Sequence, residues 1–155
     1  MSIDRFTPQK LFGVFELKNL APAHPIIGEL DDVFFCPQSR HAGIPDEAME
    51  EAQNDGRLKL LAYGKEAGYS IFSTSDDRFI AHTGHPEYNA TRLADEAKRD
   101  HENPDVPPPV NFDFMEPLNR WRSHRNTFFA QWVSYCYLKI STHDMWVKKY
   151  VADSP

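Results

Sequence analysis

Three short apolar runs between residues 57 and 83 constrain the fold more than any other part of the sequence. They cover residues 57–63 (RLKLLAY), 69–74 (YSIFST) and 79–83 (FIAHT), and turn-forming residues separate them. Short runs of β-branched and aromatic residues joined by such turns predict strands that pair locally as an antiparallel meander. The chain therefore builds at least part of a sheet.

Two further apolar runs and a polar segment come before the meander. Residues 11–16 (LFGVFE) follow Pro8 and predict a strand near the amino terminus. Residues 32–36 (DVFFC) predict a second strand, buried on both faces, which we expect Pro37 to end. Residues 46–55 carry acids in their first turn and precede a glycine, which predicts a surface helix.

Two helices and a long loop are expected after the meander. Asn89 is a plausible N-cap for a helix that continues to Asp100. Residues 103–117 hold five prolines and predict an extended loop, here called the proline-rich loop. Ser123 begins an amphipathic helix that we expect to continue to about Lys139. Its apolar face, which we expect in the core, is formed by Phe128, Phe129, Trp132, Val133, Cys136 and Tyr137.

The order of these elements does not close a repeating β-α unit, and no helix precedes the strand at residues 11–16. The pattern therefore predicts a partial α/β sheet with flanking helices, in a single domain that spans residues 1–155. A strand at the amino terminus of a half-sheet exposes an unpaired apolar edge. We therefore expect the chain to self-associate or to bind a partner.

Composition excludes several classes of function. The net charge of −6 and the scattered basic residues argue against a nucleic-acid-binding protein. No apolar run approaches the roughly 18 residues of a membrane-spanning helix, and the amino terminus lacks a signal-peptide core, so we expect a cytoplasmic protein with no membrane contact. Cys36 and Cys136 lie in apolar settings, which predicts reduced, buried thiols.

The stretch HTGHPEYN at residues 82–89 is the strongest candidate for chemistry. It follows the third strand of the meander, and active sites of α/β sheets gather at the carboxyl ends of strands. Pro86 favours an extended backbone at His85, so that His85 and Glu87 project to roughly the same side. A carboxylate that accepts from one imidazole nitrogen fixes the tautomer and makes the other nitrogen a better base.

Two other interpretations of this stretch stay open on spacing alone. A metal site would use His82, His85 and Glu87, with His101 as an outside candidate. However, His82 falls within the predicted strand, so its side chain should point away from that of His85, and no cysteine lies nearby; we therefore assign no metal. An ordinary solvated turn is the third interpretation. Spacing favours the oriented histidine only weakly.

Several stretches together resemble the homoserine O-succinyltransferase family, the homoserine O-acyltransferases of methionine biosynthesis. The similarity is to the carboxyl-terminal half of these enzymes, and the GHPEY and WRSH strings occur in the family's order. The matching stretches are 8–16 (PQKLFGVFE), 36–42 (CPQSRHA), 60–100 and 119–141. The resemblance implies a class I glutamine amidotransferase-like (flavodoxin-like) α/β fold. It also implies transfer of a succinyl or acetyl group from coenzyme A to the hydroxyl of L-homoserine through a cysteine nucleophile.

The resemblance assigns roles to five residues. His85 resembles the family's catalytic base and Glu87 its partner, while Lys10, Ser39 and Arg99 fall on positions that bind substrate. The chemistry suits these roles, because a lysine and an arginine can hold the carboxylate of an amino acid and a serine hydroxyl can donate to it.

One departure from the family pattern concerns the nucleophile. The family's cysteine lies upstream of the segment that resembles residues 11–16, so neither Cys36 nor Cys136 corresponds to it. We therefore expect the amino-terminal half with the nucleophile to be absent from this chain, which would make the chain alone inactive.

Three functional interpretations follow. The first is a fragment or split half of the acyltransferase, with no bound cofactor, succinyl-CoA or acetyl-CoA as co-substrate, and either a homo-oligomer or a complementary half as partner. The second is a catalytically silent binding or assembly module of the same fold. The third is an independent metal- or histidine-dependent hydrolase, which only the HTGHPEYN stretch supports. The retained site residues favour the first.

Overall fold

The computed structural model describes residues 4–5 and 10–152, with side chains for residues 10–139. The strands are β1 (Asp4–Arg5), β2 (Leu11–Asn19), β3 (Val33–Arg40), β4 (Ala42–Gly43), β5 (Leu58–Gly64), β6 (Gly68–Thr74) and β7 (Ile80–His82). The helices are α1 (Asp46–Asn54), α2 (Ala90–Asp100) and α3 (Arg122–Ala152).

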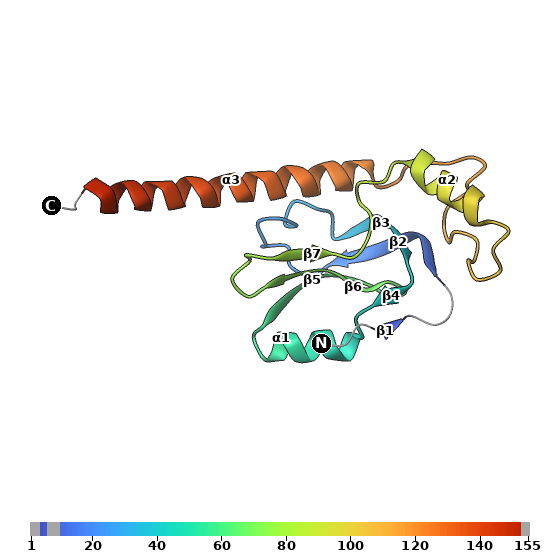
Figure 1. Cartoon of the computed structure of the whole chain (residues 1–155), viewed down its shortest axis with the longest axis horizontal. Coiled ribbons are helices and arrows are strands. Elements are labelled where there is room, and N and C mark those ends of the chain that lie inside the picture. The colour runs from blue at the N-terminus through green and yellow to red at the C-terminus, as the bar shows by residue number, and fades with distance from the viewer. Residues whose placement is uncertain (1–3, 6–9, 153–155) are drawn as a thin grey trace.

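Five strands form the main sheet in the order β3-β2-β5-β6-β7, and every pairing in it is antiparallel. β5, β6 and β7 form the meander that the sequence predicted, and β1 pairs with β4 beside it. Figure 1 shows α1 and α3 on opposite sides of the sheet and α2 at one end. The predicted α/β class with flanking helices is confirmed.

β3 is longer than predicted, and the expectation that Pro37 ends it is wrong. The strand continues to Arg40, with Pro37 opposite Val14 of β2. The carbonyl oxygen of Pro37 accepts a hydrogen bond from the backbone N–H of His85 at 2.8 Å, on the side away from β2. Since the nitrogen and carbonyl of a strand residue point to the same side, the proline ring costs no bond of the β2–β3 ladder.

The prediction of an unpaired strand edge at residues 11–16 is also wrong. β2 lies between β3 and β5, and where it does not reach β5 the proline-rich loop covers it. Val14 N–H donates to the carbonyl of Val110, and Val110 N–H donates to that of Phe12, both at 2.9 Å. Gly13 permits this approach, because a Cβ there would collide with the backbone of Val110. The loop thus acts as a local edge strand.

Two helices match their predicted ends closely. α1 ends at Asn54, and Gly56 after it has a φ of 71°, a left-handed conformation that favours glycine. α2 begins after Asn89, whose side chain accepts from the backbone N–H of Arg92 at 2.7 Å. Because this cap fixes the start of α2, it also fixes the direction in which the polar face of α2 points.

α3 begins as predicted but is much longer, and the expected core face is only partly buried. Phe128 is buried, whereas Trp132, Val133 and Tyr137 are 41%, 66% and 70% exposed. Cys136 is also exposed, so the prediction of a buried thiol holds only for Cys36. The side of α3 that faces the core is formed by Phe128, Phe129 and Tyr135, so Val133 and Tyr137 point away from it. The last turns of α3 extend past the sheet (Figure 1).

Candidate active site

His85 lies in the turn between β7 and α2, held by backbone contacts to β3. Its N–H bonds to Pro37 as described above, and its carbonyl accepts from the N–H of Tyr88 at 3.1 Å. Gly84 lies so close to the carbonyl of Pro37 and to the thiol of Cys36 that a Cβ would come within 3 Å of each. The turn therefore needs glycine at 84 to bring His85 against β3.

His85 and Glu87 form the pair that the motif predicted. Nδ1 of His85 lies 2.8 Å from Oε1 of Glu87, and the side chains are 33% and 55% exposed. A carboxylate in this position assigns the proton to Nδ1 and leaves Nε2 with a lone pair. Within residues 10–139, no hydrogen-bond partner occupies Nε2. The imidazole is thus oriented as a general base requires.

His82 has a different environment, as expected for a strand residue. Its Nδ1 accepts from the N–H of Gly84 at 3.0 Å, its Nε2 lies 3.8 Å from the thiol of Cys36, and its ring packs edge-on against Phe128. Burial, reinforced by His85 when that ring is protonated and by the charge of Arg40, lowers the pKa of His82 to about 3. His82 is therefore a neutral packing residue at physiological pH.

The residues proposed for a metal site do not converge in the part of the chain with described side chains. His82 faces Cys36, His85 faces Glu87, and His101 lies at the end of α2 with Nδ1 2.9 Å from the carbonyl of Lys98. Within that part, no three histidine, cysteine or acidic side chains form a group that could hold an ion.

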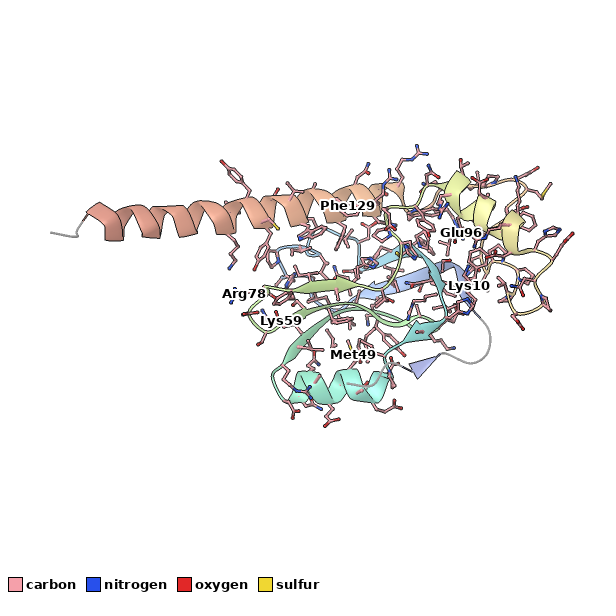
Figure 2. The ribbon with its side chains drawn as sticks, in the orientation of Figure 1. Lys10, Met49, Lys59, Arg78, Glu96 and Phe129 are labelled. Carbon is pink, nitrogen blue, oxygen red and sulfur yellow. The ribbon has the colours of Figure 1, made fainter. Side chains whose placement is uncertain are left out.

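The three substrate-binding candidates come together around two acids of α2. Ser39 Oγ donates to Glu96 Oε2 at 2.7 Å. Lys10 Nζ lies 3.3 Å from Asp100 Oδ2 and 4.0 Å from Glu96 Oε2. Arg99 binds both carboxylate oxygens of Asp100, at 2.6 and 2.7 Å. Figure 2 shows Lys10 and Glu96 together at one end of the sheet. We call Lys10, Ser39, Glu96, Arg99 and Asp100 the substrate cluster.

Both acids of the substrate cluster are ionised at neutral pH. Burial alone raises the pKa of Glu96, but hydrogen bonds from Ser39 and Tyr88 and the charge of Lys10 outweigh it, so the net pKa is lowered. The hydrogen bond from Arg99 lowers the pKa of Asp100 to about 2. Two carboxylates therefore hold the two cations of the cluster in place.

Three side chains at this site, Tyr88, Glu96 and Asp100, were not predicted from the sequence. The Tyr88 ring stacks on His85, with centroids 4.3 Å apart and planes 19° apart, and its hydroxyl donates to Glu96 Oε1 at 2.9 Å. A signal was present for Glu96, because it lies four residues after Arg92 and three before Arg99, on one face of the predicted helix. Nothing in the sequence alone showed that Lys10 would face it.

Neither cysteine is placed as a nucleophile for His85. The Cys36 thiol is buried on β3 and donates to the carbonyl of Pro37 at 3.4 Å. Burial raises the pKa of Cys36 far above its ordinary value, so the thiolate does not form. Cys136 lies on the exposed face of α3. An acyl transfer that uses a thiolate therefore needs a cysteine from outside these two positions.

Comparison with known proteins identifies the family. The model of the homoserine O-succinyltransferase family matches residues 3–142. The chain belongs to this family. It is 36% identical over 143 residues to a homoserine O-succinyltransferase of Proteus mirabilis, covering 88% of this chain and 45% of that enzyme. It is 37% identical over 134 residues to a homoserine O-acetyltransferase of a Geobacillus species, covering 83% and 43%. The chain thus spans less than half the length of these family members.

The solved structures that resemble this chain share little sequence with it. SMU.1228c matches at a TM-score of 0.57 with 13% identity, over 84% of this chain and 54% of that one, which shows a shared fold alone. A glutamine amidotransferase from Thermotoga maritima matches at a TM-score of 0.46 with 14% identity, over 66% and 43%. Among the described residues, no helix is both long and apolar enough to span a bilayer.

Proposed function

We propose that this chain forms the carboxyl-terminal half of a homoserine O-acyltransferase. The reaction transfers a succinyl or acetyl group from acyl-CoA, the co-substrate, to the hydroxyl of L-homoserine in methionine biosynthesis. The observation that carries the proposal is the His85–Glu87 pair, with Nδ1 and Oε1 2.8 Å apart, in a member of this family. No bound cofactor is needed, because the thioester itself supplies the activated acyl group.

In the proposed mechanism His85 acts in both halves of a ping-pong reaction. First, His85 Nε2 takes the proton of a cysteine thiol, the thiolate attacks the thioester carbonyl, and the imidazolium gives the proton to the departing thiolate of coenzyme A, which leaves His85 neutral for the second half. Next, the homoserine hydroxyl attacks the acyl-enzyme, and His85 removes the hydroxyl proton while the cysteine leaves as thiolate. Glu87 fixes the Nδ1–H tautomer and stabilises the imidazolium in each half. The cysteine comes from the part of the enzyme that the relatives carry beyond the matched region.

The substrate cluster is the proposed site for the amino-acid end of homoserine. Lys10 and Arg99 supply positive charge for its carboxylate, and the Ser39 hydroxyl supplies a hydrogen bond. Glu96 and Asp100 hold these side chains before the ligand arrives, which lowers the conformational entropy lost on binding. We also propose that residues 1–155 form a single domain.

The test is complementation. The purified chain should release no coenzyme A from acyl-CoA with homoserine, but should do so when mixed with an amino-terminal half of the family that carries the nucleophilic cysteine.

In the mixed enzyme His85→Ala should lower kcat by about 10³-fold or more, because both proton transfers lose their base. His101→Ala, an exposed histidine outside the site, is the matched control and should keep the activity. Equal losses in the two variants would contradict the assignment of His85.

A catalytically silent binding module is the second candidate, because neither Cys36 nor Cys136 is placed to act as the nucleophile. This module would bind homoserine in calorimetry, yet complementation would fail. Its partner would be a second copy of the chain or a complementary half. For either function we propose a cytoplasmic location, where thiols such as Cys36 stay reduced.

A further inference from the structure

Tyr88 lies between the two parts of the site and contacts both. Its ring stacks on the imidazole of His85, and its hydroxyl donates to Glu96 of the substrate cluster at 2.9 Å. Among the side chains with described positions, no other both contacts the His85 ring and forms a hydrogen bond to the substrate cluster. Tyr88 therefore links His85 to the substrate cluster.

Glu87 alone is a weak anchor for His85. The Glu87 side chain is 55% exposed, so water competes for its carboxylate and its long side chain loses conformational entropy when it is held. The imidazole is itself one-third exposed. An aromatic ring stacked at 4.3 Å limits rotation of the imidazole plane and works without a charged partner. The stack thus supplies the restraint that an exposed carboxylate does not.

Tyr88 is held firmly at both ends. Its carbonyl accepts from Nε1 of Trp121 at 2.7 Å, and Trp121 is 1% exposed. Its hydroxyl binds Glu96, whose side chain is 7% exposed and also accepts from Ser39. Burial and the hydrogen bond to Glu96 raise the pKa of Tyr88, so the hydroxyl stays a donor throughout the physiological range. A ring fixed in this way can fix its neighbour.

We propose that Tyr88 is a positioning residue for the base: its ring holds the imidazole of His85 in the plane that keeps Nδ1–H on Glu87. The inference rests on the proposed function, in which His85 is the base. It adds that the base is braced against the substrate cluster through Glu96, and not through its acidic partner alone. Tyr88 touches neither reacting atoms nor the proton that moves.

Two variants separate the ring from the hydroxyl. Tyr88→Leu removes the stack and the hydroxyl, whereas Tyr88→Phe keeps the stack and removes only the bond to Glu96. Tyr69→Phe is the matched control, because Tyr69 also packs on an aromatic ring, Tyr63, and donates to a glutamate, Glu50, at 3.1 Å, but lies beside α1. All three are made in the full chain, and thermal melting is recorded first to show that each is folded.

The main measurement is the tautomer of His85, read from imidazole ¹⁵N chemical shifts of the chain alone. We expect the Nδ1–H form in the wild type and in Tyr69→Phe. Tyr88→Leu should move His85 towards the Nε2–H form that a histidine side chain in water prefers, and Tyr88→Phe should show a smaller change. A role confined to general packing would leave the tautomer unchanged. This measurement needs no acyl transfer, so its outcome is independent of whether the complemented enzyme works.

The kinetic measurement uses the complemented enzyme. Tyr88→Leu should lower kcat about 10-fold or more while KM for homoserine changes less than about 3-fold, and Tyr88→Phe should lower kcat by about 3-fold. The proposal is overturned if Tyr88→Leu keeps both the wild-type tautomer and a kcat within 2-fold. If Tyr88→Leu does not fold, Tyr88→Met, which also removes the stacked ring, replaces it, and a wild-type tautomer together with a kcat within 2-fold in that variant overturns the proposal. An inactive wild-type mixture with the expected tautomer shifts counts against the proposed function and supports the role of Tyr88.

Discussion

His82 and His85 are three residues apart in the chain, yet the structure gives them opposite properties. His85 projects from a turn towards a carboxylate, whereas His82 packs against the Cys36 thiol and the Phe128 ring. An imidazole buried among apolar groups is disfavoured as a cation, which keeps His82 neutral. Two identical side chains therefore differ because of their surroundings alone: His82 packs in a strand, and His85 pairs with a carboxylate in a turn.

The burial of His82 should make the stability of the fold depend on pH. Its pKa is lowered from an ordinary 6.5 to about 3, so between these values the unfolded chain binds the proton and the folded chain does not. The contribution of neutral His82 is therefore complete above pH 6.5 and is lost as the pH falls towards 3. We expect about 1 kcal/mol per pH unit, below the limit of about 1.4, because His82 is only partly buried.

Urea unfolding between pH 6.5 and 4.5 measures this contribution. His82→Asn can still accept from the N–H of Gly84 but cannot be protonated, so its free energy of unfolding should change less with pH than that of the wild type. His101→Asn, on the surface at the end of α2, is the control and should keep the wild-type dependence. Parallel curves for wild type and His82→Asn would show that His82 is not held neutral.

At the scale of elements, local signals placed most of the site and could not place its long-range contacts. The meander, the Asn89 cap and the HTGHPEYN turn were predicted because strands, caps and turns depend on neighbouring residues. The continuation of β3 through Pro37 was not, since it depends on which side of β3 faces His85. The pairing of Ser39 and Lys10 with α2 spans 57 to 90 residues, and no local pattern encodes it.

The contact between β2 and the proline-rich loop gives a prediction at this scale. Gly13 has a φ of 137°, and a Cβ there would overlap the backbone of Val110. Gly13→Ala must therefore push the loop off β2 and break two backbone hydrogen bonds, which we expect to cost about 2–4 kcal/mol of unfolding free energy.

Gly56→Ala is the matched control for Gly13→Ala, because Gly56 also has a positive φ, 71°, but nothing lies within 4 Å of its Cβ position. It should lose only about 1 kcal/mol from backbone strain. Chemical denaturation of both variants measures the difference. Equal losses would mean that the loop does not depend on close approach to β2.

At the scale of the whole molecule, α3 exposes apolar side chains to solvent. Val133 and Tyr137, one turn apart on the helix, are 66% and 70% exposed. Soluble monomers rarely expose an apolar surface of this kind, and the net charge of −6 gives only modest repulsion between copies. We expected self-association through an open strand edge, but the proline-rich loop covers part of that edge and α3 offers the apolar surface instead.

We therefore predict that the isolated chain self-associates through α3. Sedimentation velocity should show a sedimentation coefficient that rises with concentration in the micromolar range. Val133→Glu together with Tyr137→Glu should abolish this rise, because an interface would have to desolvate two new charges. Ser134→Glu, an exposed polar position on the same helix, adds charge without removing apolar surface and should leave at least part of the association. A wild-type chain that stays monomeric at every concentration would show that the exposed face of α3 does not bind a second copy.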